Sequence, residues 1–357
     1  MPIEVIGLFS YRNASEHLPP PDTDFDLPFV KRFVEAHDRN GYDRMLIANA
    51  ATWPDSLPFA AYISGVTKRL QFMIAHRPGF VAPTMAARML ATIDRLSDGR
   101  CGVHIITGAS DKELESDGDF TTKDLRYARS GEYVDVLRRM WTSDKPFNHA
   151  GQFYRFNGAF ARVKPIQPGG IPVFWGGASP ESIVEAGRCA DVYATGIDTL
   201  ARTGTLFDKV RAAAATHGRS LKFCLSARLI MGETENDAWA YAHSILDGVV
   251  ANLDALKSSS INAVPTQRYK ELCSLDACQD TRLWTGITQV TGGTRAVTSL
   301  VGTPSQVTDE LMKYYDIGVR CFLISGFDMD KDPDHLGRTV IPDLRARVAD
   351  RERSAAA

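Results

Sequence analysis

The sequence predicts an α/β protein, a (β/α)8 TIM barrel with insertions, and three observations predict it. Eight short apolar runs of strand composition alternate with segments of helical spacing from one end of the chain to the other. The length of 357 residues suits one such barrel with insertions. The first apolar run leads into LFSYR instead of a glycine-rich dinucleotide turn, so an open doubly wound sheet is the less favoured alternative.

The predicted strands and helices alternate along most of the chain. The strands cover the apolar runs at 3–10, 45–48, 70–75, 101–106, 172–175, 192–194, 223–231 and 321–324. The helices have apolar residues three and four positions apart, over 27–40, 84–96, 125–141, 180–189, 199–217, 235–256 and 305–317. Residues 152–156 and 161–164 predict a small hairpin beside the barrel.

One long connection interrupts this pattern. Residues 252–303 lack a steady period, and long connections in compact domains are often functional lids. We therefore expect a single domain over 1–357, in which 252–303 is an insertion over the barrel mouth. A surface excursion without a role is the alternative. Residues 340–357 form a charged C-terminal tail, either a solvated helix end or an arm across a neighbouring subunit.

The composition favours a small-molecule ligand. Hydrophobic residues make up 44% and charged residues 24% of the chain, and the formal net charge is −2, so general attraction to nucleic acid or to anionic lipid is not expected. The six cysteines are scattered without metal-site spacing, which predicts a cytoplasmic protein with no metal. No apolar run approaches the length of a membrane span.

A phosphate site is predicted where the fifth strand meets its helix, at Gly176-Gly177-Ala178-Ser179-Pro180. Glycines let the backbone approach a ligand, serine caps a helix, and proline suits its first turn. The free N–H groups and the helix dipole then attract an anion. A plain tight turn would use the same residues.

Further polar residues stand at predicted strand ends. The fourth strand ends at Thr107, before a long acidic loop, and His76-Arg77 ends the third. Arg228 lies in the apolar run LSARLIMGE, where a buried guanidinium needs an anionic partner from the protein or from a ligand. By strand alternation His104 is expected to point toward the helices as a core residue.

An ordered set of motifs then covers nearly the whole chain: IAHRPGFVAPTMAARMLATIDRLSDGR, VHIITGASDKELESDGDF with Arg126-Tyr127, FWGGAS, LWTGITQVTGGT, LVGTP and FLISGF. This set resembles the bacterial luciferase-like flavin monooxygenases, and most closely their alkanesulfonate monooxygenase group. The resemblance implies a TIM barrel that binds reduced FMN (FMNH2) from a separate NAD(P)H:FMN reductase. With O2 the flavin would form a C4a-peroxyflavin that oxygenates an alkyl- or sugar-sulfonate and releases sulfite and an aldehyde. A homodimer or homotetramer is also implied.

The resemblance assigns roles to residues of this sequence. Thr107 would meet the isoalloxazine edge, and Tyr127 the phosphate. The implied cofactor-binding residues are His76, Thr107, Tyr127, Gly177, Ala178 and Ser179. The implied substrate-binding residues are Trp53, Arg77, Arg228, Arg295 and Phe327. The implied catalytic residues are His76, Arg228 and Arg295.

The chain also departs from the sulfonate group, which has a His two residues after the arginine that matches Arg228; here that position is Ile230. An arginine of the mobile loop falls on Thr291, a tyrosine on Phe327 and a cysteine near Trp53. These departures bear on the substrate more than on the flavin. Two alternatives therefore stay open: hydride transfer from F420 or FMN on the same fold, and a flavin-binding barrel without catalysis.

Overall fold

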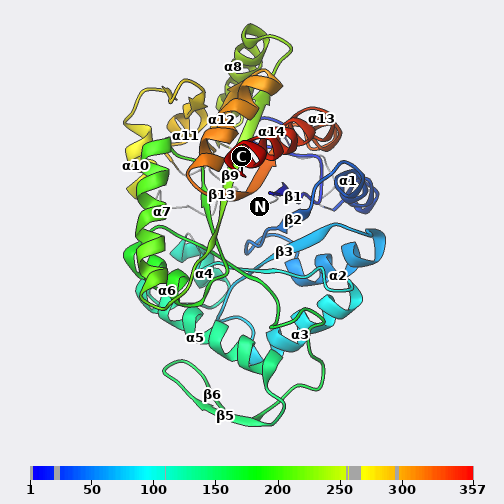
Figure 1. Ribbon diagram of the computed structural model, residues 1–357, viewed down its shortest axis with the longest axis vertical. Helices are drawn as coiled ribbons and strands as arrows, with labels where there is room; N and C mark the ends of the chain where they lie inside the picture. Colours follow the sequence, from blue (N-terminus) through cyan, green and yellow to red (C-terminus); the bar gives the residue numbers. More distant parts are fainter. Residues whose placement is uncertain are drawn as a thin grey trace. The chain divides into compact units, whose positions relative to one another are not determined.

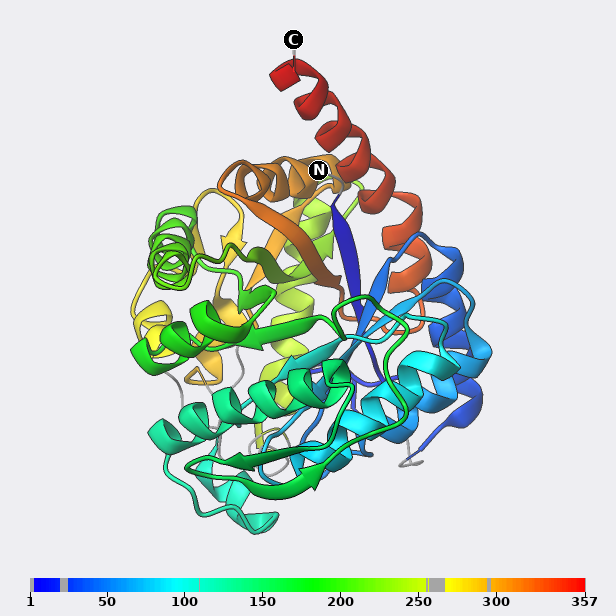
Figure 2. The same ribbon diagram turned by 60° about the horizontal axis from the view of Figure 1, so that its bottom comes forward.

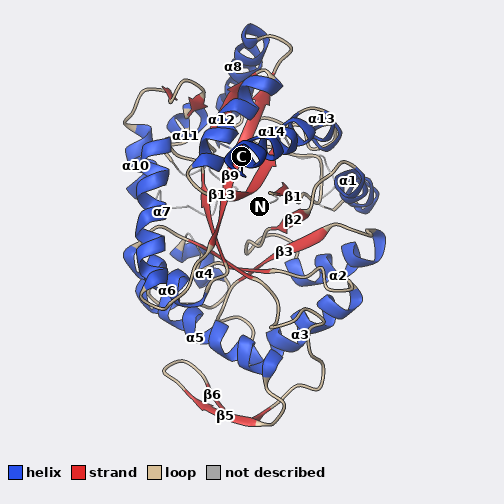
Figure 3. Cartoon of the chain, in the orientation of Figure 1, coloured by secondary structure: helices blue, strands red, loops and turns tan. Residues whose placement is uncertain are grey.

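The computed structural model describes residues 3–19, 25–108, 110–254, 256, 267–293 and 297–356. Strands and helices alternate along the chain, as Figure 1 and Figure 3 show. Two compact units are described separately below. Unit 1 comprises Met1–Met45, Thr195–Thr205 and Phe223–Ala357, and unit 2 comprises Leu46–Ala194 and Leu206–Lys222.

Eight strands form a closed (β/α)8 barrel, which confirms the predicted fold class. Their order is β9, β13, β1, β2, β3, β4, β7 and β8, and β8 pairs again with β9. Their bounds are β1 Glu4–Leu8, β2 Arg44–Ile47, β3 Gln71–His76, β4 Val103–Ile105, β7 Val173–Gly176, β8 Val192–Gly196, β9 Lys222–Met231 and β13 Val319–Ser325. Each run that the sequence assigned to a barrel strand overlaps one of these eight.

The helices of unit 2 are α2 Ser56–Val66, α3 Pro83–Leu96, α4 Asp111–Ser116, α5 Lys123–Thr142 and α6 Pro180–Cys189, and α7 Leu200–Ala215 has residues in both units. Helix α2 was not predicted from the sequence, since its apolar residues show no one-sided pattern. The helix begins at Ser56 because the carboxylate of Asp55 accepts the N–H of Leu57 at 2.9 Å.

The hairpin of unit 2 begins earlier in the chain than predicted. Strands β5 (Phe147–Ala150) and β6 (Arg155–Ala159) pair antiparallel, and residues 161–164 form no strand. The carboxylate of Glu132 in α5 accepts the N–H groups of Phe153 and Tyr154, at 2.9 Å each. This contact fixes a turn at residues for which the sequence predicted a strand.

The helices of unit 1 are α1 Leu27–Arg39, α8 Glu235–Ala251, α10 Gln267–Cys273, α11 Gly286–Val290, α12 Pro304–Asp316, α13 Asp332–Arg338 and α14 Val340–Ala356. Helix α14 packs on α12 and α13, and its last turns, red in Figure 2, extend away from them. The charged tail is therefore helical over its described residues.

Strand β9 changes its partner at Arg228. This residue pairs with Ser325 at the end of β13 and with Ser299 at the start of β12 (Ser299–Gly302). Two short strands, β10 (Cys278–Gln279) and β11 (Leu283–Trp284), extend the sheet beyond β12. The end of the 252–303 segment thus joins the sheet, while its action as a lid stays a prediction.

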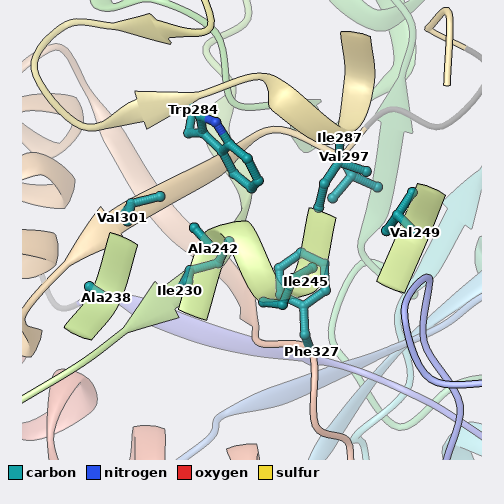
Figure 4. Close-up of a cluster of buried hydrophobic side chains, with 10 residues drawn as sticks. All are labelled: Ile230, Ala238, Ala242, Ile245, Val249, Trp284, Ile287, Val297, Val301 and Phe327. Atoms are coloured by element: carbon teal, nitrogen blue, oxygen red, sulfur yellow. The ribbon is translucent and has the colours of Figure 1, made fainter. Parts of the chain in front are cut away.

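A buried apolar cluster lies between α8, α11 and β12 (Figure 4). Its members are Ile230, Ala238, Ala242, Ile245, Val249, Trp284, Ile287, Val297, Val301 and Phe327. Phe327 comes from the loop after β13 and is 1% exposed. Burial of this ring anchors the loop in the core of unit 1.

Candidate functional site

Three predicted site segments of unit 2 follow neighbouring strands. Strand β4 pairs in parallel with β3 on one side and β7 on the other, so His76, Ile105 and Trp175 stand in register. The N–H of Ile106 donates to the carbonyl of His76 at 3.1 Å. Thr107, Arg77 and the Gly177 turn therefore leave one edge of the sheet, at the carboxyl ends of its strands, where barrel enzymes carry their chemistry.

The turn between β7 and α6 leaves no room for a side chain at residue 177. Gly177 has φ +114°, and a β-carbon there would lie 2.5 Å from Ser182 Oγ and 2.8 Å from the Tyr127 hydroxyl. Glycine is required both by this φ and by the close approach. The contact also brings Tyr127, from α5, against the turn. These two predicted cofactor residues are thus neighbours.

Helix α6 begins directly after this turn. Ser179 is its N-cap and accepts the N–H of Ser182 at 3.4 Å, and Pro180 occupies the first turn. The remaining N–H groups of the first turn and the helix dipole suit a phosphate. The exposed carboxylate of Glu181 accepts hydrogen bonds from its own backbone N–H and from Ser179, and these lower the pKa of Glu181. This carboxylate therefore competes with a phosphate for the N-terminus of α6.

His76 is buried and its tautomer is fixed. The Tyr133 hydroxyl donates to the carbonyl of Val81 at 2.9 Å, so His76 Nε2, 2.7 Å from the same hydroxyl oxygen, must be the donor of that pair. Burial lowers the pKa of His76 to about 4. The imidazole is therefore neutral near pH 7, with Nδ1 as its acceptor nitrogen.

Arg77 ties three loops of unit 2 together and is 5% exposed. Its Nε donates to Asn49 Oδ1 and its Nη2 to Glu113 Oε1, both at 3.0 Å, and Nη1 lies 3.6 Å from Asp117 Oδ2. Glu113 Oε1 also accepts the N–H of Ala51 at 2.9 Å. These contacts join the segments that follow β2, β3 and β4. This role was not predicted for Arg77 or Glu113.

His104 corrects one prediction. Trp175 stands in register with Ile105, and its indole N–H donates to Ser182 Oγ of α6 at 3.0 Å. Ile105 thus shares the helix-facing side of the sheet, and His104 points to the opposite side. There its Cε1 lies 3.4 Å from the position of a β-carbon on Gly176, and burial lowers the pKa of His104 to about 4. Counting alternation from Thr107 failed because regular strand geometry ends at Ile105.

The predicted substrate residues of unit 1 centre on Arg228. Its Nη2 donates to Glu16 Oε2 at 3.0 Å, and both side chains are 14% exposed. The guanidinium carbon lies 4.1 Å from the centre of the Phe327 ring. The structure thus brings Arg228 and Phe327 together and adds Glu16, which was not predicted. The only sign of Glu16 in the sequence was that a buried arginine needs an anionic partner. Trp53 of unit 2 is 44% exposed, and Arg295 lies outside the described residues.

Over the described ranges, no group of three or more His, Cys, Asp or Glu side chains is arranged to hold a metal ion. In the same part of the chain, no helix combines the length and the apolar character needed to cross a membrane.

The whole fold matches solved monooxygenases and a coenzyme F420-dependent reductase. EDTA monooxygenase from Chelativorans sp. BNC1 superposes with a TM-score of 0.78 at 20% identity, over 97% of this chain and 94% of that one. The oxygenating constituent of 3,6-diketocamphane monooxygenase from Pseudomonas putida, solved with FMN, gives 0.68 at 17%, over 95% and 96%. The coenzyme F420-dependent tetrahydromethanopterin reductase from Methanopyrus kandleri gives 0.70 at 17%, over 96% and 100%.

At these identities the structural likeness establishes the fold alone. The family follows from the sequence, because the sequence model of the luciferase-like monooxygenases matches residues 3–321, which is most of the chain. The chain belongs to the luciferase-like monooxygenase family.

Proposed function

We propose that this flavin-dependent monooxygenase uses FMNH2 from a separate NAD(P)H:FMN reductase, together with O2, to oxygenate a small anionic organosulfur compound. An alkyl- or sugar-sulfonate is the proposed substrate, with sulfite and an aldehyde as products. One observation supports the flavin part of the proposal. The Gly177 turn, which the Tyr127 hydroxyl contacts, leads into the first turn of α6 and follows the sheet edge at which β3 and β4 also end. Such a turn suits the phosphate of FMN.

The proposed flavin contacts all belong to unit 2. Ala178 and Ser179 would offer N–H and hydroxyl groups to the phosphate, and Gly177 lets the turn pass close to Tyr127 and Ser182. Thr107 would border the ring. A contact of His76 with the ring stays a prediction from the sequence, since His76 shares the helix-facing side of Ile105 and its Nε2 lies 2.7 Å from the Tyr133 hydroxyl of α5. When bound, reduced FMN supplies the electrons that activate O2. Arg77 and Glu113 would hold the loops that keep water from the site.

The proposed substrate contact is Arg228, which packs on the buried Phe327 ring. Contacts of Phe327, Arg295 and Trp53 with substrate are carried over from the family resemblance. A guanidinium matches sulfonate oxygens in charge and geometry. A direct contact of Arg77 with substrate stays a prediction from the sequence, since its Nε and Nη2 already donate to protein oxygens.

A product assay tests this proposal. The purified protein is supplied with FMN, a flavin reductase with NADH, O2 and a panel of sulfonates. Sulfite and aldehyde should appear only when all components are present. Flavin-dependent oxygen consumption that responds to substrate without sulfite release would remove the sulfonate and leave the monooxygenase.

F420 is the second candidate, because the structural relatives include F420-dependent enzymes. Parallel fluorescence titrations with FMN and F420 separate the two cofactors. Preference for F420, with hydride transfer to a substrate and no need for O2, would replace the first proposal. Binding of flavin without turnover of any panel compound would favour a flavin-binding barrel instead.

A further inference from the structure

The guanidinium of Arg228 already has an anionic partner inside the protein. Glu16 comes from the segment after β1, and Arg228 from the point where β9 leaves β13 for β12. Their contact is 3.0 Å, and both side chains are mostly buried. The charge demand of Arg228 is therefore met without a ligand.

The pair leaves the guanidinium only partly used. Glu16 accepts from Nη2, whereas Nε is buried and has no hydrogen-bond partner among the described residues. The Phe327 ring covers one face of the guanidinium at 4.1 Å. A single contact is weaker than the two-pronged contact that guanidinium groups make with oxyanions. Another anion with several oxygens can satisfy Arg228 better than Glu16 does.

The other charged groups nearby oppose a second anion. Burial lowers the pKa of His17, which leaves its ring without charge near pH 7, and Asp328 also acts on this histidine. Lys331, which pairs with Asp328 at 3.0 Å, is 82% exposed. An anion that approaches Arg228 therefore meets the carboxylates of Glu16 and Asp328, and Arg228 already acts on the buried carboxyl group of Asp332.

We propose that Glu16 is a specificity-determining residue that occupies the anion position of Arg228 until the anionic group of a substrate displaces it. This inference rests on the proposed function, since it gives the sulfonate its place. Because Glu16 must be displaced, an anion binds only if its affinity for Arg228 exceeds that of the Glu16 carboxylate. A permanently ionised group with several oxygens meets this condition, and weaker anions do not. Removing the charge of Glu16 should open Arg228 to anions.

Binding of trifluoromethanesulfonate tests this without flavin or turnover, with its ¹⁹F resonance followed as the full-length protein is added. Glu16→Gln keeps the shape of the side chain and should bind the probe at least about 10-fold more tightly than the wild type. Glu4→Gln is the matched control, because Glu4 pairs with Arg44 at 3.3 Å in the same unit. It should bind the probe as the wild type does.

The double variant Glu16→Gln with Arg228→Gln leaves no unpaired carboxylate. It should lose the tighter binding of the probe that Glu16→Gln gains. Equal or weaker binding by Glu16→Gln overturns the proposal, and so does absence of binding by every variant, since an uncovered Arg228 must take the anion. Failure of the proposed function would appear elsewhere, as missing flavin-dependent turnover with the ¹⁹F results unchanged.

Discussion

The hydroxyl of Tyr127 lies 2.8 Å from the position that a β-carbon on Gly177 would take. Tyr127 belongs to α5 and Gly177 to the turn after β7, and the sequence separates them by a strand pair and a long loop. Residue 177 therefore has no room for a side chain, and glycine lets the turn lead directly into the N-terminus of α6, whose first N–H groups suit a phosphate.

Gly177→Ala should therefore weaken FMN binding by at least about 10-fold, because the added methyl group strains the backbone and displaces Tyr127 or Ser182. Fluorescence titration measures the affinity. Gly158→Ala is the matched control, since Gly158 also has a positive φ, of +66°, but open space around it. Equal FMN affinity in Gly177→Ala and the wild type would rule out this turn as the phosphate site.

Glu181→Gln tests the same helix end from the opposite direction. The carboxylate of Glu181 accepts hydrogen bonds at the start of α6, where the phosphate is proposed to bind. Loss of its charge should strengthen binding of FMN more than binding of riboflavin, which has no phosphate. Parallel titrations of the two flavins check this. An identical change for both would mean that the phosphate does not meet α6.

Glu113→Gln should loosen the loops that Arg77 joins. The substitution removes the negative charge 3.0 Å from a guanidinium that is 5% exposed, and Asp117 at 3.6 Å is the nearest remaining carboxylate. We expect a loss of about 1–3 kcal/mol in the free energy of unfolding, measured by urea denaturation. The neighbouring Glu115→Gln, on the exposed side of α4, serves as the control and should change little. Equal stability of both variants would contradict the proposed role of Glu113.

The barrel was readable from the sequence because strands buried on both faces appear as short apolar runs. Elements without such a pattern were missed or displaced: α2 is apolar on most sides, and the hairpin turn is set by Glu132, which no local rule reveals. For the site, the apolar run around Arg228 predicted that its guanidinium needs an anionic partner. It could not name Glu16, which lies 212 positions away, since only the folded chain brings the two together.

The pH dependence of stability should carry a contribution from Asp332 in unit 1. Its carboxylate accepts the N–H of Asp328 at 2.8 Å and lies against Gly326, and burial raises the pKa of Asp332 to about 7. A raised pKa means that the folded state binds the proton more tightly than the unfolded state, whose value is 3.8. The stabilisation by this group is therefore complete below about pH 4 and is lost as the pH rises toward 7.

Asp332→Asn keeps an acceptor for the Asp328 N–H and removes the ionisation. Relative to the wild type, the variant should gain unfolding free energy between pH 5 and pH 8, by an amount on the order of a few kcal/mol at most. Urea denaturation at both pH values measures this difference. Asp330→Asn changes an exposed carboxylate of the same loop and should show the same difference from the wild type at both pH values. A pH-independent difference for Asp332→Asn would mean that Asp332 is ionised throughout, so that Arg228 and Lys331, whose charges lower its pKa, outweigh its burial.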